Sequence, residues 1–467
     1  MNPVIAVVGA GFSGSMAALH LLAALPRSWS VLLCEKGGRF GRGLAYGTQA
    51  SDHLLNLRAA NMSAYPDRPQ HFADWLGRLP EAEASDVVAT PAGTFAPRAL
   101  YGRYLAELLT QAVVSEGAPR LHLVHDAVAD LVPVAGGYRL RTEGGTSYAV
   151  AGAVLAMGNL TGPGAPPSRH RLDPWRPDAF GRLHPDRPVL VVGTGLTMVD
   201  AVASLRGRGF SGRIVALSRR GLVPKVHAPT RAWPVPDLAA ADLASLTRLT
   251  RRIRAEIMAA RQAGRDWRDV IDALRPITTY LWRSLPPREQ ARFLRHLRPF
   301  WDVHRHRAAP PAAAAIAAEI AAGGLEVRAG RILAITDGPS EAVVTIRPRG
   351  GGPDAALTVQ GIIDATGIGR VDETGDPLLR RLVANGLARP GPFGLGLAAG
   401  DDYRLRGPQA GRLWTLGPLL RGSLWECVAV PDIRNQAAEV AALVAALVAA
   451  PLAGEVERPA PSLRQAG

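Results

Sequence analysis

The sequence has little cysteine. Only two cysteines occur in 467 residues, Cys34 and Cys427, and they form neither a CxxC pair nor a zinc-binding spacing. This excludes a disulfide framework and a cysteine metal site, and we expect no bound metal. It also argues against disulfide reductase chemistry, which needs a redox-active cysteine pair. Such sparse cysteine suits a reducing compartment, so we expect a cytoplasmic protein.

Long apolar runs and basic tracts interleaved with aromatic residues are also missing. The most apolar stretch, residues 436–454, carries Glu439 and Pro451, so we expect a buried helix and no membrane span. The formal net charge is +14, almost all of it from arginine. Two explanations stay open, a basic solvated surface and attraction of anionic ligands. No tract predicts a nucleic-acid partner.

An internal repeat organises what is present. Residues 4–25 predict a buried strand, a glycine turn and an apolar helix, and residues 187–207 repeat that order. Each copy continues with a second strand, a meander and a closing strand. The order predicts an α/β fold with two Rossmann-like, three-layer dinucleotide-binding domains, whose parallel sheets carry antiparallel meander crossovers.

The first glycine turn has the pattern GxGxxG, formed by Gly9, Gly11 and Gly14. The first glycine permits the tight turn, the second lets the backbone approach a pyrophosphate, and the third lets helix and strand pack closely. Free N–H groups at the helix start then favour phosphate. Glu35 ends the next strand, where a carboxylate can bind ribose hydroxyls. The pattern predicts dinucleotide binding, with a plain glycine turn as the alternative.

The second turn contains Gly193, Gly195 and Thr197, with methionine in place of the third glycine. The strand that follows ends in Arg219 and Arg220, where many NAD-binding proteins have an acid. A carboxylate would repel a 2′-phosphate, whereas arginine binds one in a bidentate way. We therefore expect NADPH in preference to NADH. The alternative is that both arginines are ordinary surface residues.

Further motifs carry a family resemblance. They are GAGFSG, GRGLAYGT (41–48), HLLNLRAANMS (53–63), FAPRALYGRYL (95–105), GTGLTMVD (193–200), RPFWDVHRHR (298–307) and LWECVAVPDIR (424–434). On these motifs the chain resembles the YdhS-like FAD/NAD(P)-binding proteins, a branch of the flavoproteins with two dinucleotide-binding domains. It is more distantly similar to the class B flavin monooxygenases.

The resemblance implies roles for individual residues. The first glycine motif and Glu35 would hold the ADP half of FAD. The segments that contain Tyr46 and Asn56 would line the flavin ring, and Arg98 would lie near that ring or the pyrophosphate. A packing cluster at a helix start is the alternative for Arg98. Trp425 and Glu426 belong to a segment that would close over the pyrimidine edge of the flavin.

The predicted domains follow from the repeat and this resemblance. Residues 1–160 and 368–452 would form a discontinuous FAD-binding domain with an insertion at about 40–118. The proline-rich residues 161–187 predict a linker. Residues 188–367 would form an NAD(P)H-binding domain with a helical insertion at about 235–320, and residues 453–467 a disordered tail.

The second insertion is rich in arginine. Between Arg248 and Arg307 there are fifteen arginines and six acidic residues, with aromatic residues at helical spacings. One interpretation is an amphipathic helical subdomain with an aromatic core. The other is a lid that selects an anionic small-molecule substrate through His304, Arg305 and Arg307, because arginine binds carboxylates. Arg98, His304 and Arg305 are therefore the candidate catalytic residues.

These patterns favour hydride chemistry at a flavin. The leading hypothesis is an NADPH-dependent flavin monooxygenase that acts on a small metabolite through a flavin hydroperoxide. An NADPH dehydrogenase or quinone reductase without oxygenation is the second hypothesis. A non-catalytic flavin-binding interaction protein is the third.

Overall fold

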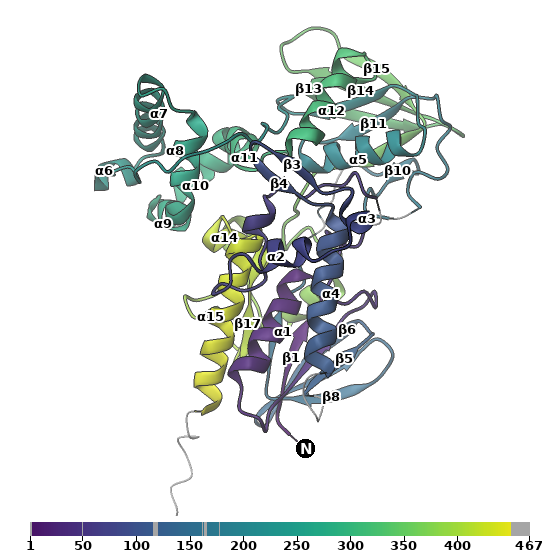
Figure 1. Ribbon diagram of the computed structural model, residues 1–467. Coiled ribbons are helices and arrows are strands. Elements are labelled where there is room, and N and C mark those ends of the chain that lie inside the picture. The colour runs from purple at the N-terminus through teal and green to yellow at the C-terminus, as the bar shows by residue number, and fades with distance from the viewer. Residues whose placement is uncertain are drawn as a thin grey trace, which may run out of the picture.

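The computed structural model contains two α/β domains, one above the other in Figure 1, with a helical insertion that extends sideways from the upper one. It describes residues 2–48, 50–114, 120–160, 162, 166–176 and 178–449. The predicted disordered tail at 453–467 lies outside the described residues. The predicted fold class is confirmed, with two parallel sheets of Rossmann type, each joined to an antiparallel meander.

The first domain is built on a parallel sheet of five strands. Its strands are short and almost wholly apolar, because helices and the meander cover both faces and leave no polar side. In spatial order they are β17 (Leu413–Thr415), β9 (Gly152–Leu155), β1 (Val4–Val8), β2 (Ser30–Cys34) and β5 (Leu121–Val124).

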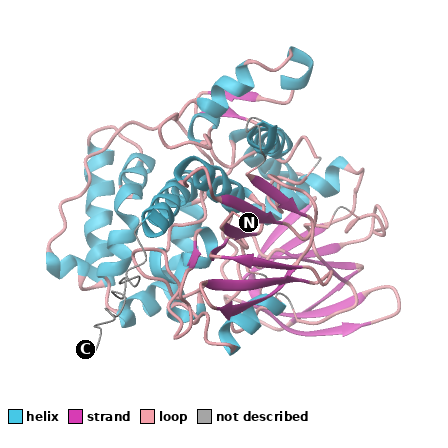
Figure 2. Ribbon diagram, turned by 90° about the horizontal axis from the view of Figure 1, so that it is seen from below, coloured by secondary structure: helices cyan, strands magenta, loops and turns pink. Residues whose placement is uncertain are grey.

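Three helices cover one face of this sheet, as Figures 1 and 2 show: α1 (Phe12–Ala24), α4 (Arg98–Val114) and α15 (Val430–Ala449). A three-stranded meander covers the other: β6 (Val128–Val134), β7 (Gly137–Thr142) and β8 (Ser147–Val150). Helix α15 packs along α1, so the apolar stretch from residue 436 is a core helix as predicted. Across the described part of the chain, no helix combines the length and apolarity that a membrane span requires.

The second domain has a seven-stranded sheet. In spatial order its strands are β10 (Arg171–Leu172), β16 (Gly361–Asp364), β11 (Val189–Val192), β12 (Ile214–Ser218), β13 (Leu325–Asp337), β14 (Ala342–Pro348) and β15 (Ala355–Val359). The long β13 is parallel to β12 and then antiparallel to β14, so it joins the parallel core to the meander. Strand β10 lies within the predicted linker and forms the edge of this sheet, so that part of the linker belongs to the domain.

Helices α5 (Leu196–Gly207) and α12 (Pro310–Ala321) pack on the second sheet. Because α12 contacts α5 and β13, we assign it to the domain and limit the insertion to the helices before it. Those are α6 (Ala240–Leu243), α7 (Leu246–Gln262), α8 (Trp267–Ala273), η2 (Arg275–Ile277), α9 (Thr278–Ser284), α10 (Pro287–Arg292), η3 (Phe293–Leu297) and α11 (Arg298–Arg305). Ser245 caps α7 and Asp266 caps α8, each accepting from a backbone N–H of the first turn.

The insertion has an apolar core that includes Trp282 and Phe293, and Trp425 from the segment after α14 packs into it. The smaller elements of the chain are η1 (Ala59–Asn61), α2 (His71–Gly77), α3 (Glu81–Ala84), β3 (Val88–Thr90), β4 (Gly93–Phe95), α13 (Pro377–Ala384), η4 (Pro392–Gly394), η5 (Gly417–Leu420) and α14 (Arg421–Leu424). The insertion is therefore a helical subdomain with aromatic residues in its core, which was one of the two interpretations of the sequence.

Candidate active site

The first glycine turn is a position where side chains do not fit. Gly9 has a φ of +97°, and a Cβ there would stand 2.6 Å from the carbonyl oxygen of Ala156. A Cβ on Gly14 would stand 1.7 Å from the carbonyl oxygen of Gly9. The first and third glycines are thus required by the turn and by close helix–strand packing, in the roles that the sequence predicted.

Gly11 is the N-cap of α1 and provides no side-chain cap. The first N–H groups of the helix are therefore available to an anion, with the positive end of the helix dipole behind them. The loop opposite comes close, since a Cβ on Gly43 would lie 2.8 Å from the Cα of Gly11. This bare backbone cradle fits the diphosphate of FAD.

Glu35 lies at the edge of the same cradle. Its Oε2 accepts from the backbone N–H of Ala10 at 2.9 Å, and its Oε1 accepts from that of Gly37 at 2.9 Å. These bonds fix the carboxylate beside the turn. Each oxygen retains further lone-pair capacity, so the group can still accept hydrogen bonds from ribose hydroxyls.

Tyr46 and Asn56 are held by different neighbours. The Tyr46 ring packs edge-on against Tyr101 of α4, with ring centroids 4.7 Å apart. Burial raises the pKa of Tyr46 to about 12, so its hydroxyl stays protonated near neutral pH. The carbonyl of Asn56 accepts from Nε2 of His227 at 2.9 Å. The Asn56 segment is therefore fixed by the second domain, and the flavin role of both residues stays a prediction.

The second cradle lies at the start of α5. Gly193 has a φ of +121°, and a Cβ there would stand 2.1 Å from the carbonyl oxygen of Ala365. Gly195 is the N-cap without a side-chain cap, and no described atom lies within 4 Å of a Cβ built there. Thr197 is half-buried in the first turn, and Met198 takes the place of the third glycine inside the core. The open approach to Gly195 fits a dinucleotide diphosphate.

The two arginines after β12 differ in their surroundings. Arg220 donates from Nη2 to the carbonyl of His296 at 3.1 Å, and its guanidinium lies 4.8 Å from the centre of the Phe300 ring. It therefore connects β12 to the insertion. Arg219 is exposed. Of the two residues predicted to bind a 2′-phosphate, Arg219 is the one whose side chain has the freedom to do so.

Arg98 joins the two domains. Its Nη2 lies 2.9 Å from Oδ2 of Asp200 on α5, and its Nε donates to the carbonyl of Leu54 at 3.3 Å. Close by, Nε2 of His53 lies 2.7 Å from Oγ of Ser204. The sequence indicated a role for Arg98 near the flavin or the pyrophosphate, but it gave no signal for this partner in the other domain. Its contact with the cofactor stays a prediction.

Trp425 and Glu426 face the helical insertion. The Trp425 ring stacks on Trp282 with ring centroids 5.1 Å apart, although its φ of +64° is unusual for a residue with a side chain. Glu426 is buried, and its Oε1 accepts from Nε1 of Trp301 at 3.0 Å. Burial opposes the charge of Glu426, but Arg305 and other neighbours hold the pKa of its carboxyl below the ordinary value.

The three polar residues predicted to contact an anionic substrate do not lie together. His304 donates from Nδ1 to the carbonyl of Phe300 at 2.7 Å, and its ring packs edge-on against Trp267. Arg307 forms two hydrogen bonds with Asp272, at 2.8 and 3.2 Å. Both residues are used inside the insertion. Arg305 alone points to the segment after α14, where its Nη2 lies 3.5 Å from Oε2 of Glu426.

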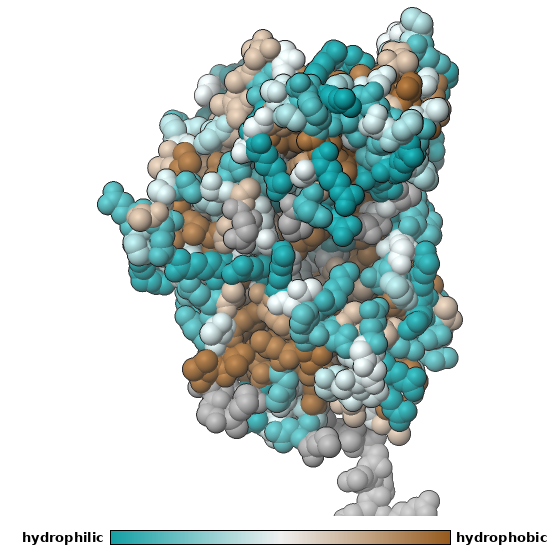
Figure 3. Space-filling view, turned by 90° about the vertical axis from the view of Figure 1, so that its right-hand side faces the viewer, coloured by the Kyte–Doolittle hydropathy of each residue, from teal (hydrophilic) through white to brown (hydrophobic). Residues whose placement is uncertain are grey.

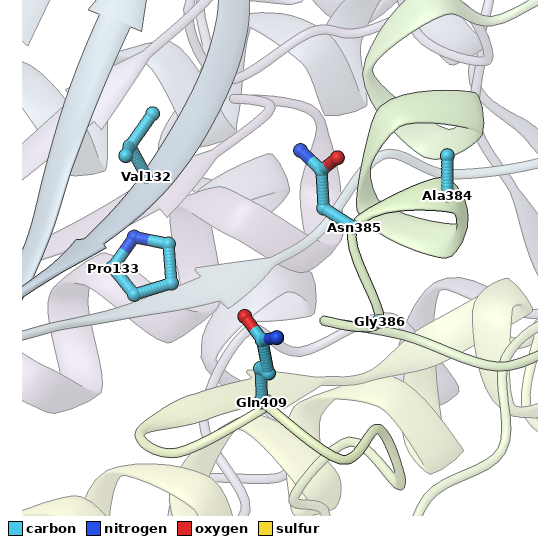
Figure 4. Close-up of a pocket in the computed structure, with 6 residues that line it drawn as sticks. All are labelled: Val132, Pro133, Ala384, Asn385, Gly386 and Gln409. Atoms are coloured by element: carbon cyan, nitrogen blue, oxygen red, sulfur yellow. The ribbon is translucent and has the colours of Figure 1, made fainter.

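Two surface grooves lie outside the cradles. One, of about 510 Å³, lies between β6 and the end of α13, and Figure 4 shows Asn385 and Gln409 beside it. The other, of about 420 Å³, borders loop 38–42 and is lined by apolar residues of α4 and by Leu123. Figure 3 views that side of the molecule and shows apolar side chains gathered in its lower half. None of the cradle glycines lines either groove.

Comparison with known proteins agrees with this geometry. A family model described as FAD-NAD(P)-binding matches residues 6–160, which contain the first cradle and Glu35. This part of the chain is therefore similar to FAD/NAD(P)-binding domains. A curated relative, an L-aspartate N-monooxygenase (nitrosuccinate-forming) from Streptomyces cremeus, is 33% identical over 181 residues, which cover 33% of this chain. The chain spans about a quarter (27%) of the length of that relative.

Solved structures match the whole fold. The reduced ornithine hydroxylase of Pseudomonas aeruginosa has a TM-score of 0.65 at 16% identity, over 96% of this chain and 100% of that one. The ornithine N-hydroxylase of Kutzneria sp. 744 has a TM-score of 0.62 at 14% identity, over 94% of this chain and 98% of that one. The L-lysine 6-monooxygenase of Pseudomonas syringae has a TM-score of 0.62 at 16% identity, over 96% of this chain and 99% of that one. At these identities the likeness establishes the fold alone.

Proposed function

We propose that the protein is an FAD-dependent, NADPH-dependent monooxygenase that hydroxylates the nitrogen of a small amine-bearing metabolite. The observation that carries the proposal is the pair of bare glycine cradles, at Gly11 on α1 and Gly195 on α5, in one chain. Among the similar folds is the ornithine N-hydroxylase of Kutzneria sp. 744, which was solved with reduced FAD, NADP⁺ and L-ornithine. The finer resemblance to YdhS-like proteins stays a prediction.

Different residues of this chain would bind the two cofactors. The start of α1 would face the FAD diphosphate, and Glu35 its ribose. The start of α5 would face the NADPH diphosphate, and Arg219 its 2′-phosphate. When bound, FAD would supply the hydride and electron-transfer chemistry that links the nicotinamide to dioxygen. The insertion packs its apolar core against Trp425, and in this proposal it keeps water from that region.

The test begins with the purified protein, which should be yellow. Under anaerobic conditions NADPH should bleach the flavin absorbance. Oxygen and peroxide are then measured with L-aspartate, L-ornithine and cadaverine as probes. A monooxygenase consumes oxygen in excess of the peroxide released, and the difference equals the hydroxylated product formed.

Each rival function gives a different result. A dehydrogenase or quinone reductase reduces quinones with little oxygen consumption and no hydroxylated product. A non-catalytic flavin-binding protein contains FAD that NADPH does not bleach. Either result would refute the monooxygenase proposal.

A further inference from the structure

Three arginine side chains meet two carboxylates where the insertion covers the first domain. Arg275 comes from η2, Arg305 from α11 and Arg421 from the start of α14. Glu426 and Asp432 come from the segment after α14 and the start of α15. Arg305, Arg421 and Glu426 have exposed fractions of only 7%, 8% and 7%. We call these five residues the arginine cluster.

The arginine cluster leaves hydrogen-bonding capacity unused. The distance between Nη2 of Arg305 and Oε2 of Glu426 is 3.5 Å, and that between Nη2 of Arg275 and Oδ2 of Asp432 is also 3.5 Å. Both exceed the 2.7–3.2 Å range of a good hydrogen bond. All four atoms are buried and have no hydrogen-bond partner among the described residues.

Arg421 is the extreme case. Its side chain forms no hydrogen bond or ion pair with any residue that the structure describes, and its Nε is fully buried. Its guanidinium lies 5.0 Å from the centre of the Trp425 ring. Buried polar groups in folded proteins are nearly always hydrogen-bonded, and a buried charge is normally paired. The buried Nε of Arg421, which lacks a partner, therefore marks a place for an anionic group.

The charges of the arginine cluster do not balance. Three guanidinium groups face two carboxylates, which leaves an excess of one positive charge. The neighbouring Arg298 and Asp302 pair with each other at 3.3 Å and do not change the balance. Burial raises the pKa of Asp432 above its ordinary value, although Arg275 and Arg305 oppose that shift. Burial also lowers the pKa of the nearby His306, which keeps that ring neutral.

We propose that the arginine cluster is the substrate-recognition site of the proposed monooxygenase and that its ligand is an acidic amino acid. Arg421 and Arg305 bind a carboxylate of the ligand, since a guanidinium can donate two parallel hydrogen bonds. Oε2 of Glu426 and Oδ2 of Asp432 accept from its ammonium group. A molecule with two carboxylates and one ammonium carries the net charge of −1 that the cluster lacks. The inference rests on the proposed function.

The reduced flavin ring is also an anion and could neutralise the same excess charge. The experiment therefore distinguishes a substrate carboxylate from the reduced flavin as the anion at this cluster. Tryptophan fluorescence of the FAD-loaded protein is titrated with L-aspartate, L-glutamate, succinate and cadaverine, without NADPH, and Trp425 beside Arg421 contributes to the signal. We expect saturable binding of L-aspartate, weaker binding of succinate, which lacks the ammonium, and none of cadaverine. No saturable response to L-aspartate or L-glutamate would overturn the proposal without any variant.

Variants then locate the site. Arg421→Met should raise the Kd for L-aspartate at least roughly tenfold. Arg421→Lys should raise it less, because lysine keeps the charge but loses the bidentate fork. Arg288→Met removes an arginine whose side chain is 85% exposed, and it should leave the Kd unchanged. Equal Kd values for Arg421→Met and Arg288→Met would overturn the proposal.

A lowered flavin midpoint potential in Arg421→Met, with an unchanged Kd for L-aspartate, would also overturn it, and would assign the charge to the flavin. NADPH bleaching of FAD in the wild-type protein is measured in parallel. Intact bleaching without L-aspartate binding would refute the substrate assignment alone. Binding without bleaching would refute the proposed function instead.

Discussion

Arg98 of the first domain forms an ion pair with Asp200 of the second, with 2.9 Å between Nη2 and Oδ2 and side chains only 11% and 14% exposed. The pair connects the first residue of α4 to α5, the helix whose N-terminus forms the second cradle. It therefore helps to fix the position of the second cradle, proposed for NADPH, relative to the first, proposed for FAD. Hydride transfer depends on that geometry, because the two cofactors must meet in a near-attack arrangement.

Removing this pair should slow cofactor reduction more than it affects FAD binding. We expect Arg98→Met and Asp200→Asn each to reduce the rate of NADPH-driven flavin bleaching about tenfold, equivalent to about 1.4 kcal/mol. The double variant should be no slower than either single one, because the residues act through one contact. Anaerobic stopped-flow absorbance measures the rate. Additive effects of the two substitutions would show that the residues act separately.

Gly14→Ala should strongly weaken FAD binding. The new Cβ would stand 1.7 Å from the Gly9 carbonyl oxygen, so the turn and the helix start must separate. We expect the FAD content of the purified protein to fall by roughly tenfold or more. Gly77→Ala is the matched control, since no described atom lies within 4 Å of a Cβ at that position. Retention of FAD by Gly14→Ala would contradict the assignment of this cradle.

Arg219→Ala should weaken the binding of NADPH but not that of NADH. A charge-assisted hydrogen bond contributes about 1.5–3 kcal/mol, so the KM for NADPH should rise about tenfold or more while that for NADH stays the same. Arg220→Ala is the comparison, because that side chain bonds to His296 and should affect the stability of the insertion instead. Steady-state kinetics with both nucleotides and thermal unfolding separate the two effects. An equal rise of both KM values in Arg219→Ala would remove the basis for NADPH preference.

His227 should make the stability of the protein depend on pH. Burial lowers the pKa of its ring from 6.5 to about 4, and the neutral ring donates through Nε2 to the Asn56 carbonyl. The folded state therefore disfavours the proton that the unfolded chain accepts. This contribution to stability is complete above pH 6.5 and is lost as the pH falls towards 4, by about 3 kcal/mol in total.

His227→Gln keeps a donor for Asn56 but cannot titrate, so its unfolding free energy should change less between pH 6.5 and 4. Denaturant unfolding at several pH values measures the difference from the wild-type protein. His184→Gln is the control, because that side chain is 54% exposed. Identical pH profiles for the wild-type and His227→Gln proteins would refute the role of His227.

The cradles could be predicted from the sequence because local chemistry determines them. A buried strand, glycines at fixed spacing and an apolar helix restrict the backbone to one kind of turn, whatever the rest of the chain does. Gly9 and Gly193 therefore adopt the positive φ that the motifs require. Arg219 and Arg220 were indistinguishable in the sequence, because the contact of Arg220 with His296 depends on how the insertion packs against β12.

The polar residues between the insertion and the first domain were less predictable, because their contacts also depend on how the insertion packs. Arg305 was singled out with His304 and Arg307 because the three are close in sequence, yet successive helical residues point in different directions. Arg421 was not singled out at all. Its significance arises from burial without a partner, and only the packing of α14 against the insertion reveals that.

The position of β17 and α15 also bears on how the protein is synthesised. The first sheet obtains its last strand, and α1 its packing partner, from residues beyond 412. The second sheet, by contrast, is complete once Asp364 has been made. On the ribosome, the first domain therefore cannot be completed until the second domain has been translated and the residues beyond 412 follow. During that interval the surface of α1 that packs against α15 is exposed.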